Sequence, residues 1–446
     1  MRPYLYRGVV LCVFGLVTPT LSAQTLISSS PPVAPAQTSG QAQERGVDEF
    51  LRVALERNAE LLAVRQDIAA ARGFLTQSRL RPNPGLDVSV FNGRPLGSPG
   101  EHGFDIGYAH TFELGGKRAR RIDVAQVGVE IAELLVADRE RLLRADIKTR
   151  FAEALAAARN VSTFGEIYEL NARSLKVATQ RVSEGEGAPL EQTLLQVEVG
   201  RIGADRLLAN AAAARAFGAL KLSSGIAPGE MLTLRGELTA EGVDISMDAA
   251  LERALAQRPD LKAAKAEEAR AAAEQRLAQA ERVPDVIGLV RYGQASTQFD
   301  QLGLSPSGAV VPLRDQDRTL TAGVSIPLPF ANRNQGAIET ALARQKAASL
   351  RREFIEQSVR TDVQTAFVQY AAARQAAEVF DKQVMQQMQQ TMTTIRTSYE
   401  LGESQLLDLV QEQRRLVETQ KAFTDVLKEL YIARAALEAA VGGEVR

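Results

Sequence analysis

The first candidate for chemistry in this sequence is a metal site near the front of the chain. His102 and His110 are the only histidines, and Asp105 lies between them. Imidazole and carboxylate groups are common metal ligands, but these three residues do not have the spacing of ligands on one helix face. We therefore interpret the histidines as polar residues of a loop and an interface, and we predict no resident metal.

A second candidate is a ladder of soft ligands. Met385, Met388 and Met392 recur at helical spacing, and thioether sulfur binds soft metals. The same spacing is typical of methionines that pack in a helical core, which is the interpretation we favour. The sequence also contains no phosphate-binding loop, no nucleophile elbow and no HExxH motif. We predict no catalytic residue, no cofactor and no enzymatic activity.

Composition and charge narrow the class of protein further. The 446 residues include 53 Lys and Arg and 54 Asp and Glu, so the formal net charge of −1 provides no global field that attracts nucleic acid. Apolar residues make up 45% of the chain, but aromatic residues only 5%, and tryptophan is absent. This composition favours long, closely packed helices over a large aromatic core. We expect no nucleic-acid partner.

The first segment has the features of a secretory signal peptide. Residues 1–23 contain the basic residues Arg2 and Arg7, then an apolar run, then a small-residue cleavage site. A transmembrane anchor is the alternative, although the run is short for crossing a bilayer. Cys12, the single cysteine, lies in the apolar run without the small residues that precede a lipid-attachment cysteine, so the mature chain forms no disulfide. Residues 24–45 are rich in Ser, Pro, Gln and Ala and predict a flexible linker.

The rest of the chain consists of two related halves. Residues 46–225 form a first structural repeat and residues 246–446 a second, and an equatorial segment over 226–245 joins them. Internal similarity between successive parts of a chain is the mark of a duplicated architecture. The matching stretches are 53–61 with 253–261, 116–118 with 332–334, and 219–225 with 436–442.

Each half has the order helix, strand, loop, strand, long helix, sharp turn, helix. An opening helix is expected over 46–80, and period-two alternation, as in Leu86, Val88 and Val90, predicts the strands. The loop of the second hairpin, over about 295–318, is expected to be long and polar. The long helices, of roughly 66 residues, would each extend about 100 Å. The expected hairpins are 84–114 and 284–329, the long helices 117–183 and 336–401, and the tip turns 184–189 and 401–404.

Strand length and strand number point to a membrane barrel shared between chains. No window has about 18 consecutive apolar residues, so any membrane crossing must use strands. Each strand has about eight to eleven residues, near the length that crosses a bilayer at a tilt. Four strands cannot close a barrel, and open sheet edges are not tolerated in lipid. The sheet must therefore close with strands of other chains; three copies would give twelve strands, although strand counting alone does not determine that number.

Abrupt junctions join the hairpins to the long helices, in FELGGKRARRIDVA and in SIPLPFANRNQGAIETA. Prolines stop sheet pairing at the rim, polar Asn and Arg suit the membrane interface, and Gly336 would allow the chain to change direction. The predicted junction residues are Gly115, Gly116, Pro327, Pro329, Asn332, Arg333 and Gly336.

With its duplication and its junctions, the chain resembles the TolC-like outer-membrane factors of Gram-negative tripartite efflux pumps. The stretch IPLPFANRNQGAIETA is similar to the branch that serves heavy-metal efflux of the cobalt-zinc-cadmium type. The resemblance implies a mostly α fold with transmembrane β-strands, in which a homotrimeric twelve-stranded outer-membrane β-barrel continues into a long periplasmic α-helical barrel. It implies a passive exit duct that conducts divalent heavy-metal cations to the outside.

The resemblance also implies partners, and it leaves alternatives open. The implied partners are a periplasmic adaptor (membrane fusion) protein, an inner-membrane RND transporter and outer-membrane lipid. One alternative is a duct of the same fold for drug efflux or type I protein secretion. Another is a periplasmic coiled-coil adaptor or scaffold without a pore, which does not account for two bilayer-length strand hairpins.

Related channels carry aspartates just after the second tip turn, where they narrow the periplasmic mouth. In GESQLLDLVQEQ the matching position is Asp408, and Gln411 stands where some relatives have a second aspartate. Glu191 is the equivalent position in the first half. In a trimer, Asp408 would form a ring of three carboxylates that attracts cations and holds the mouth shut. The alternative is a solvated acid that interacts with the dipole of its helix.

The tip turns are the segments that can reach a periplasmic partner. Glycines end helices by adopting the left-handed conformation, so their presence has a purely structural explanation as well. The predicted adaptor-docking residues are Gly185, Gly187, Gly402 and Glu403.

Overall fold

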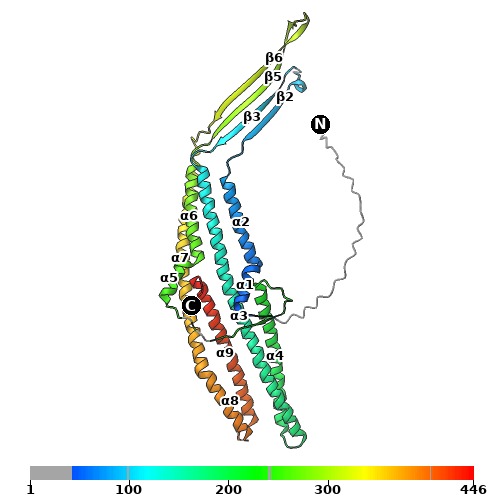
Figure 1. Cartoon of the computed structure of the whole chain (residues 1–446), viewed down its shortest axis with the longest axis vertical. Helices are drawn as coiled ribbons and strands as arrows, with labels where there is room; N and C mark the ends of the chain where they lie inside the picture. The colour runs from blue at the N-terminus through cyan, green and yellow to red at the C-terminus, as the bar shows by residue number, and fades with distance from the viewer. Residues whose placement is uncertain (1–42, 98–99, 240–241, 243, 402, 446) are drawn as a thin grey trace, which may run out of the picture. The chain divides into compact units, whose positions relative to one another are not determined.

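The computed structural model describes residues 43–97, 100–239, 242, 244–401 and 403–445 (Figure 1). The described residues belong to one compact unit that begins at residue 42. The predicted signal peptide and most of the predicted linker lie outside the described residues. Within the described ranges, no helix has the length and the hydropathy of a membrane-crossing segment.

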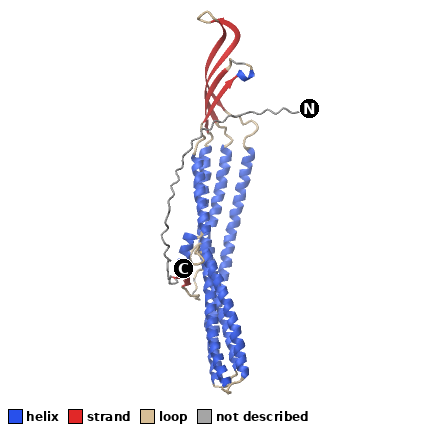
Figure 2. Ribbon diagram, turned by 90° about the vertical axis from the view of Figure 1, so that its right-hand side faces the viewer, coloured by secondary structure: helices blue, strands red, loops and turns tan. Residues whose placement is uncertain are grey.

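Helices dominate the described chain (Figure 2). They follow the same order in both halves, which confirms the predicted fold class. The long helix expected over 117–183 is α3. The second long helix is interrupted by a π-helical turn at Phe380–Val384. The helices are α1 (Val47–Arg57), α2 (Ala59–Arg79), α3 (Lys117–Ser183) and α4 (Pro189–Ser223), then α5 (Met247–Gln257), α6 (Pro259–Ala280), α7 (Gln335–Val379), α8 (Met385–Glu400) and α9 (Leu406–Val441).

The opening helix of each half is broken, and the prediction of one continuous helix over 46–80 was wrong. The break in the first half falls at Asn58, whose backbone is extended and whose Oδ1 accepts a hydrogen bond from the N–H of Leu61 at 2.9 Å. Such a side chain starts a new helix by satisfying one of its free amides. In the second half the break falls at Arg258, and Pro259 takes the first helical position, where its missing N–H costs nothing.

A four-stranded antiparallel sheet holds both predicted hairpins in the order β2-β3-β5-β6 (Figure 1). The central pair brings the halves together, since Ile106 of β3 lies opposite Tyr292 of β5. The outer strands β2 and β6 have no strand beyond them among the described residues. The strands are β2 (Gly85–Asn92), β3 (His102–Phe112), β5 (Val286–Leu304) and β6 (Val310–Ser325).

The second hairpin is longer than expected. Instead of a polar loop over about 295–318, β5 and β6 remain paired to Leu304 and Val310, with an irregularity between Gln298 and Leu302. Charged residues such as Asp315 and Asp317 lie within this ladder. The prediction failed because backbone hydrogen bonds maintain the pairing, and these do not require an apolar alternation of side chains.

A second, smaller sheet ties the start of the described chain to the segment between the halves. In it β1 (Gln43–Arg45) pairs in parallel with β4 (Leu232–Leu234). The linker predicted over 24–45 therefore ends in a strand, which is a correction. Arg45 also donates a 2.8 Å hydrogen bond to Glu230.

The main core lies where helices of both halves meet. Phe50 of α1 and Phe151 of α3 are buried with ring centroids 5.9 Å apart, and Val359 and Val363 of α7 are fully buried in the same cluster. Many of the other buried positions are alanines, whose small side chains allow close helix packing.

Candidate functional site

The turn between α3 and α4 is defined by two glycines. Gly185 has a φ of 78°, and the N–H groups of Glu186 and Gly187 donate to the carbonyl of Arg181 at 2.9 and 3.0 Å. A Cβ on Gly187 would lie 2.9 Å from the backbone nitrogen of Val182. One glycine thus provides the left-handed conformation that ends the helix, and the other allows close approach of the returning chain.

The turn between α8 and α9 repeats this geometry. The N–H groups of Glu403 and Ser404 donate to the carbonyl of Ser398 at 2.8 and 3.2 Å. Gly402, a predicted docking residue, lies outside the described residues. Helix termination is sufficient to explain the similar backbone conformation of the two turns. Docking of a partner at these residues therefore stays a prediction.

Glu191 and Asp408 occupy the same place in the two returning helices, as the third residue of α4 and of α9 respectively. Asp408 accepts a hydrogen bond from the N–H of Gln405 at 3.2 Å, and the Gln405 side chain caps the helix in return. This reciprocal pair satisfies two free amides at the helix start. Ala188, which precedes α4, offers no such cap. Asp408 and Gln411 are both exposed in the single chain.

A buried carboxylate near these turns joins α4 to α9, and the sequence did not reveal it. The side chain of Glu198 is 2% exposed. It accepts hydrogen bonds from Arg201 at 2.7 Å and from Arg414 of α9 at 2.9 and 2.5 Å. Burial raises the pKa of Glu198, but the two guanidinium groups outweigh that effect and hold the pKa below its usual value. Glu198 and Arg201 are three residues apart on one helix, which is the sole local signal for this cluster.

A cavity of about 310 Å³ lies near the tip turns, between α3, α8, α9 and the start of α4. Asn171 and Gln413 line it, and the side-chain oxygen of each is buried without a hydrogen-bond partner among the described residues. Tyr399 lines it as well. Burial and the negative charge of Glu191 raise the pKa of Tyr399, so its hydroxyl stays protonated and can donate a hydrogen bond.

At the junction of the first hairpin, two consecutive glycines turn the chain into α3. Gly115 and Gly116 have φ values of 69° and 72°. A Cβ on Gly115 would lie 2.9 Å from the carbonyl oxygen of Ala280. These positions therefore require glycine for conformation and, at Gly115, for space.

At the second junction the left-handed residue is Asn334, with a φ of 60°, and the expectation that Gly336 changes the direction of the chain was wrong. Gly336 lies in the first turn of α7. Asn334 corresponds in conformation to Gly116, so the sequence match of 116–118 with 332–334 was shifted by two residues. Asparagine tolerates this conformation, and its amide donates to the carbonyl of Ala278 at 2.9 Å. Asn332 accepts from the N–H of Asn334 at 3.0 Å.

The remaining junction residues lie where they were expected, between β6 and α7. Pro327 and Pro329 follow the last strand residue, Ser325, and Arg333 is exposed. At the first junction, Lys117 donates to Asp285 at 2.7 Å, and the N–H of Leu114 donates to the same oxygen at 3.1 Å. The sheet and α3 are thus held together by bonds between residues about 170 positions apart.

Among the described residues, both histidines lie in β3 and Met385 begins α8. His102 is exposed, whereas the ring of His110 contacts Phe112 edge-on at 4.8 Å. Met385 packs against the main core. In the part of the chain that the structure describes, no group of three or more His, Cys, Asp or Glu side chains is placed to hold a metal ion.

Comparisons with known proteins extend over nearly all of the chain. A family model described as outer membrane efflux protein matches residues 50–225 and 250–443. The cobalt-zinc-cadmium resistance protein CzcC of Cupriavidus metallidurans is 26% identical over 417 residues, which cover 93% of each chain. The nickel and cobalt resistance protein CnrC of the same organism is 25% identical over 326 residues, covering 71% of this chain and 75% of that protein.

Two solved structures illustrate the likeness in fold. A structure of CusC superposes with a TM-score of 0.71 at 17% identity, covering 93% of this chain and 99% of that chain. The open-state outer membrane channel MtrE of Neisseria gonorrhoeae superposes with a TM-score of 0.71 at 19% identity, covering 90% of this chain and 89% of that chain.

Proposed function

This chain belongs to the outer membrane efflux protein family, and from that premise we propose that it is a homotrimeric exit duct for divalent heavy-metal cations. It is an outer membrane channel of a tripartite efflux system, not an enzyme, and its helical portion lies in the periplasm. The trimer, the cargo and the partners are the parts that we propose.

The observation that carries the proposed trimer is the pair of open sheet edges. β2 leaves an edge of 8 residues and β6 an edge of 16 residues without a neighbouring strand in the described chain. An unpaired backbone group in lipid costs several kcal/mol, so a sheet in the membrane closes on itself or on other copies. Four strands are too few to close alone. Three copies provide the twelve strands of the proposed barrel.

The proposed cargo rests on the relatives. Two of them are named for resistance to cobalt, zinc, cadmium and nickel, and CzcC aligns with 93% of this chain. A second candidate has support too, because the pyoverdine export outer membrane protein OpmQ of Pseudomonas putida is 29% identical over 195 residues, which cover 42% of this chain and 38% of OpmQ. A duct for a larger organic substrate is therefore the alternative cargo assignment.

The proposed partners are a periplasmic adaptor protein and an inner-membrane RND transporter. The turns that contain Gly185 and Gly187, and Gly402 and Glu403, are the proposed docking tips. We infer that Glu191, Asp408 and Gln411 line the periplasmic mouth. The two acids support this, since each stands in the first turn of the helix that leaves a tip.

Deletion of this protein from its host tests the cargo. A metal duct predicts that the deletion causes sensitivity to cobalt, zinc or cadmium, that a plasmid copy restores resistance, and that sensitivity to organic drugs is unchanged. Sensitivity to drugs alone would overturn the metal assignment and leave the duct intact. A mature protein that is a water-soluble monomer without channel conductance would overturn the duct itself.

A further inference from the structure

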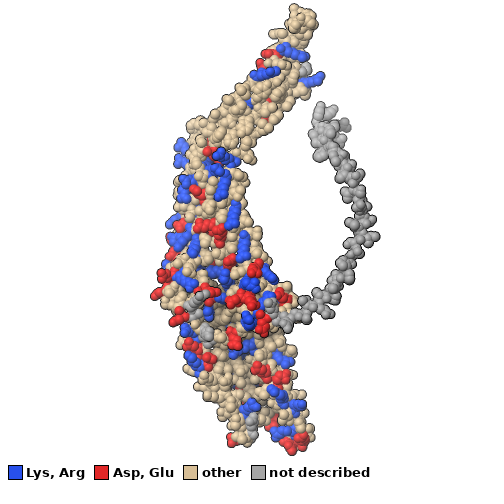
Figure 3. All heavy atoms as spheres, in the orientation of Figure 1, with Lys and Arg blue, Asp and Glu red and all other residues tan. Residues whose placement is uncertain are grey.

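The connections between the sheet and the helices carry a strong local excess of positive charge. These connections are residues 79–85, 113–121, 281–285 and 326–338, and together they contain eight Lys and Arg against three Asp and Glu. The whole chain has a net charge of −1, so this excess is not a property of the overall composition. Figure 3 shows Lys and Arg gathered on the part of the helices nearest the strands.

The opposite end of the same strands lacks this excess. The far ends of the two hairpins, residues 93–101 and 299–318, the second of which is mostly paired strand, contain three Arg against four Asp and Glu. A general need for solubility would place charge of both signs at both ends. The difference between the two ends therefore suggests that they meet different surroundings.

Three of the cations at the helix end have partners within the chain, and the others do not. Lys117 pairs with Asp285, Arg120 with Asp123, and Arg121 with Glu113. We call the other five cations the basic belt, and no ion pair joins any of them to another described residue. The basic belt is Arg79, Arg81, Arg118, Arg282 and Arg333.

The backbone that carries the basic belt is held by long-range hydrogen bonds. The Nε of Arg118 donates to the carbonyl of Arg79 at 2.7 Å, which ties the start of α3 to the end of α2. Asn334, next to Arg333, donates to the carbonyl of Ala278 and to Glu281 at 2.9 and 3.2 Å, which ties α7 to α6. Arg79, Arg118 and Arg333 are therefore presented from anchored positions.

Large apolar side chains lie exposed among these cations. Phe112 is 54% exposed, Leu328 65% and Phe330 79%. Aromatic and aliphatic side chains next to arginines match the boundary of a bilayer, where apolar groups enter the acyl region and the guanidinium groups extend to the headgroups.

We propose that the basic belt binds the phosphate headgroups of anionic phospholipids in the leaflet that faces the periplasm. This inference rests on the proposed function, which places the helices in the periplasm and the strands in the outer membrane. Guanidinium groups bind phosphate in two-pronged hydrogen bonds, and basic residues near an anionic leaflet are attracted to its surface. Bound anionic lipid would supply the counter-charges that the chain itself does not offer to these arginines.

Native mass spectrometry of the purified trimer tests the proposal, with phosphatidylglycerol and phosphatidylethanolamine of identical acyl chains as competing probes. The belt variant carries Arg79→Gln, Arg81→Gln, Arg282→Gln and Arg333→Gln, whose side chains make no hydrogen bond to another described residue. We expect the wild type to prefer phosphatidylglycerol and the belt variant to lose at least about tenfold of that preference.

A matched control removes the same number of exposed cations from the helices away from the junction. It carries Lys176→Gln, Lys262→Gln, Arg351→Gln and Lys382→Gln, and it should keep the wild-type preference. If the belt variant does not assemble, the salt dependence of lipid binding by the wild type still tests the proposal. A preference for phosphatidylglycerol that is electrostatic must fall as salt is raised.

Equal binding of the two lipids by a conducting wild-type trimer would overturn the basic belt and leave the duct intact. An equal loss of preference in both variants would also overturn it, as would a preference that salt does not change. Absence of a trimer or of channel conductance in the wild type would instead overturn the proposed function.

Discussion

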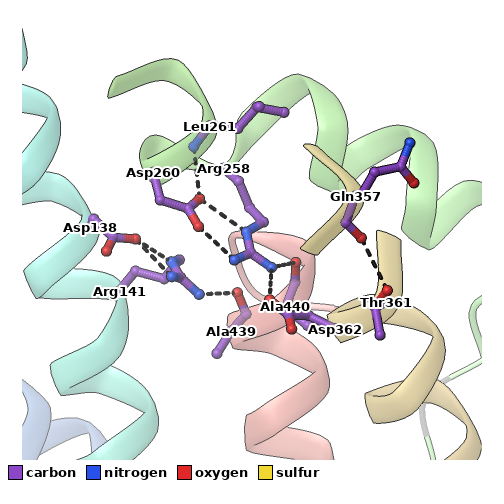
Figure 4. Close-up of polar contacts among 10 residues, drawn as sticks. All are labelled: Asp138, Arg141, Arg258, Asp260, Leu261, Gln357, Thr361, Asp362, Ala439 and Ala440. Atoms are coloured by element: carbon purple, nitrogen blue, oxygen red, sulfur yellow. Dashed lines mark hydrogen bonds and ion pairs between the residues drawn. The ribbon is translucent and has the colours of Figure 1, made fainter. Parts of the chain in front are cut away.

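In each half of the chain, the break in the opening helix contacts the end of the returning helix. We call this contact a joint; it is neutral in the first half and ionic in the second. In the first half, the neutral amide of Asn58 donates to the carbonyl of Ser223, near the end of α4, at 2.8 Å. In the second half, the guanidinium of Arg258 reaches the carbonyl of Ala440, near the end of α9, at 3.4 Å (Figure 4). Both residues stand at the break of the opening helix, so each break satisfies a carbonyl that the returning helix leaves free.

The surroundings of the two joints differ in charge. Arg258 is 5% exposed and also donates to Asp260 at 2.6 and 3.0 Å and to Asp362 at 3.0 Å (Figure 4). Arg141, which pairs with Asp138, donates to the neighbouring carbonyl of Ala439 at 2.6 Å. The two halves thus share the position of the hydrogen-bond donor but not its residue type. Any donor that is long enough to reach the free carbonyl can cap the end of the returning helix.

A glycine in the left-handed conformation follows the returning helix in both halves. Gly225 and Gly442 have φ values of 68° and 93°, and each lies against the break residue of its own half. A Cβ on Gly225 would lie 2.7 Å from the carbonyl oxygen of Arg57, whereas one on Gly442 would lie 3.3 Å from the backbone nitrogen of Arg258. The neutral joint is the more tightly packed of the two.

The largest expected effect is on the ionic joint. Arg258→Met should lower the free energy of unfolding by about 3 kcal/mol, because it leaves the half-buried Asp260 without its counter-charge. Loss of helical circular dichroism in denaturant, recorded on the purified protein, measures the change. A loss below about 1 kcal/mol would show that the ionic joint is no stronger than the neutral one.

Next in size is the buried pair that joins the two tips. Glu198→Gln should cost about 2 kcal/mol, because Arg201 and Arg414 lose their shared buried counter-charge. The loss should be local, so hydrogen exchange of the amides of α4 and α9 near the tips measures it. Arg201→Gln is the matched control, since it leaves the contact between α4 and α9 in place and should cost less.

Acid should reproduce the loss of that pair. The pKa of Glu198 is lowered on folding, so its contribution is complete above the usual glutamate pKa of 4.5 and is lost as pH falls below that value. Protection of the tip amides should therefore stay constant from neutral pH to about pH 5 and then decline in the wild type. Glu198→Gln should show a smaller decline over the same window; an equal decline would assign the effect to other carboxyls.

The neutral joint should tolerate change better. Asn58→Ala removes the cap of α2 and the bond to Ser223, and it should cost about 1 to 2 kcal/mol by the same denaturant measurement. Asn58→Asp is the control, because it keeps the acceptor for Leu61 and loses only the donor. If Asn58→Ala costs more than Arg258→Met, the ranking of the two joints is reversed.

The smallest expected effect on stability is at the acids after the tips. Asp408→Ala should cost about 0.5 to 1 kcal/mol, since it breaks the reciprocal cap with Gln405, and Glu191→Ala should cost less because α4 has no such cap. Conductance in planar bilayers tests the proposed gating role of Asp408 independently of its effect on stability. Asp408→Ala should raise the conductance of the resting channel, and a wild-type channel that is already fully open would contradict the gating role.

Local signals in the sequence determined most of the elements. Period-two alternation located β2 and β3, and the absence of proline located α3. Each of these features depends on backbone preferences within a few residues, which a single sequence displays directly.

Tertiary structure decided the contacts that join distant residues. Glu198 meets Arg414 across 216 positions and Arg258 meets Asp362 across 104, and no spacing rule connects either pair. The left-handed residue at the second junction is Asn334, because the amide of that residue can reach the end of α6. Such pairings exist only after the helices have packed side by side, so their energy depends on geometry that local sequence does not encode.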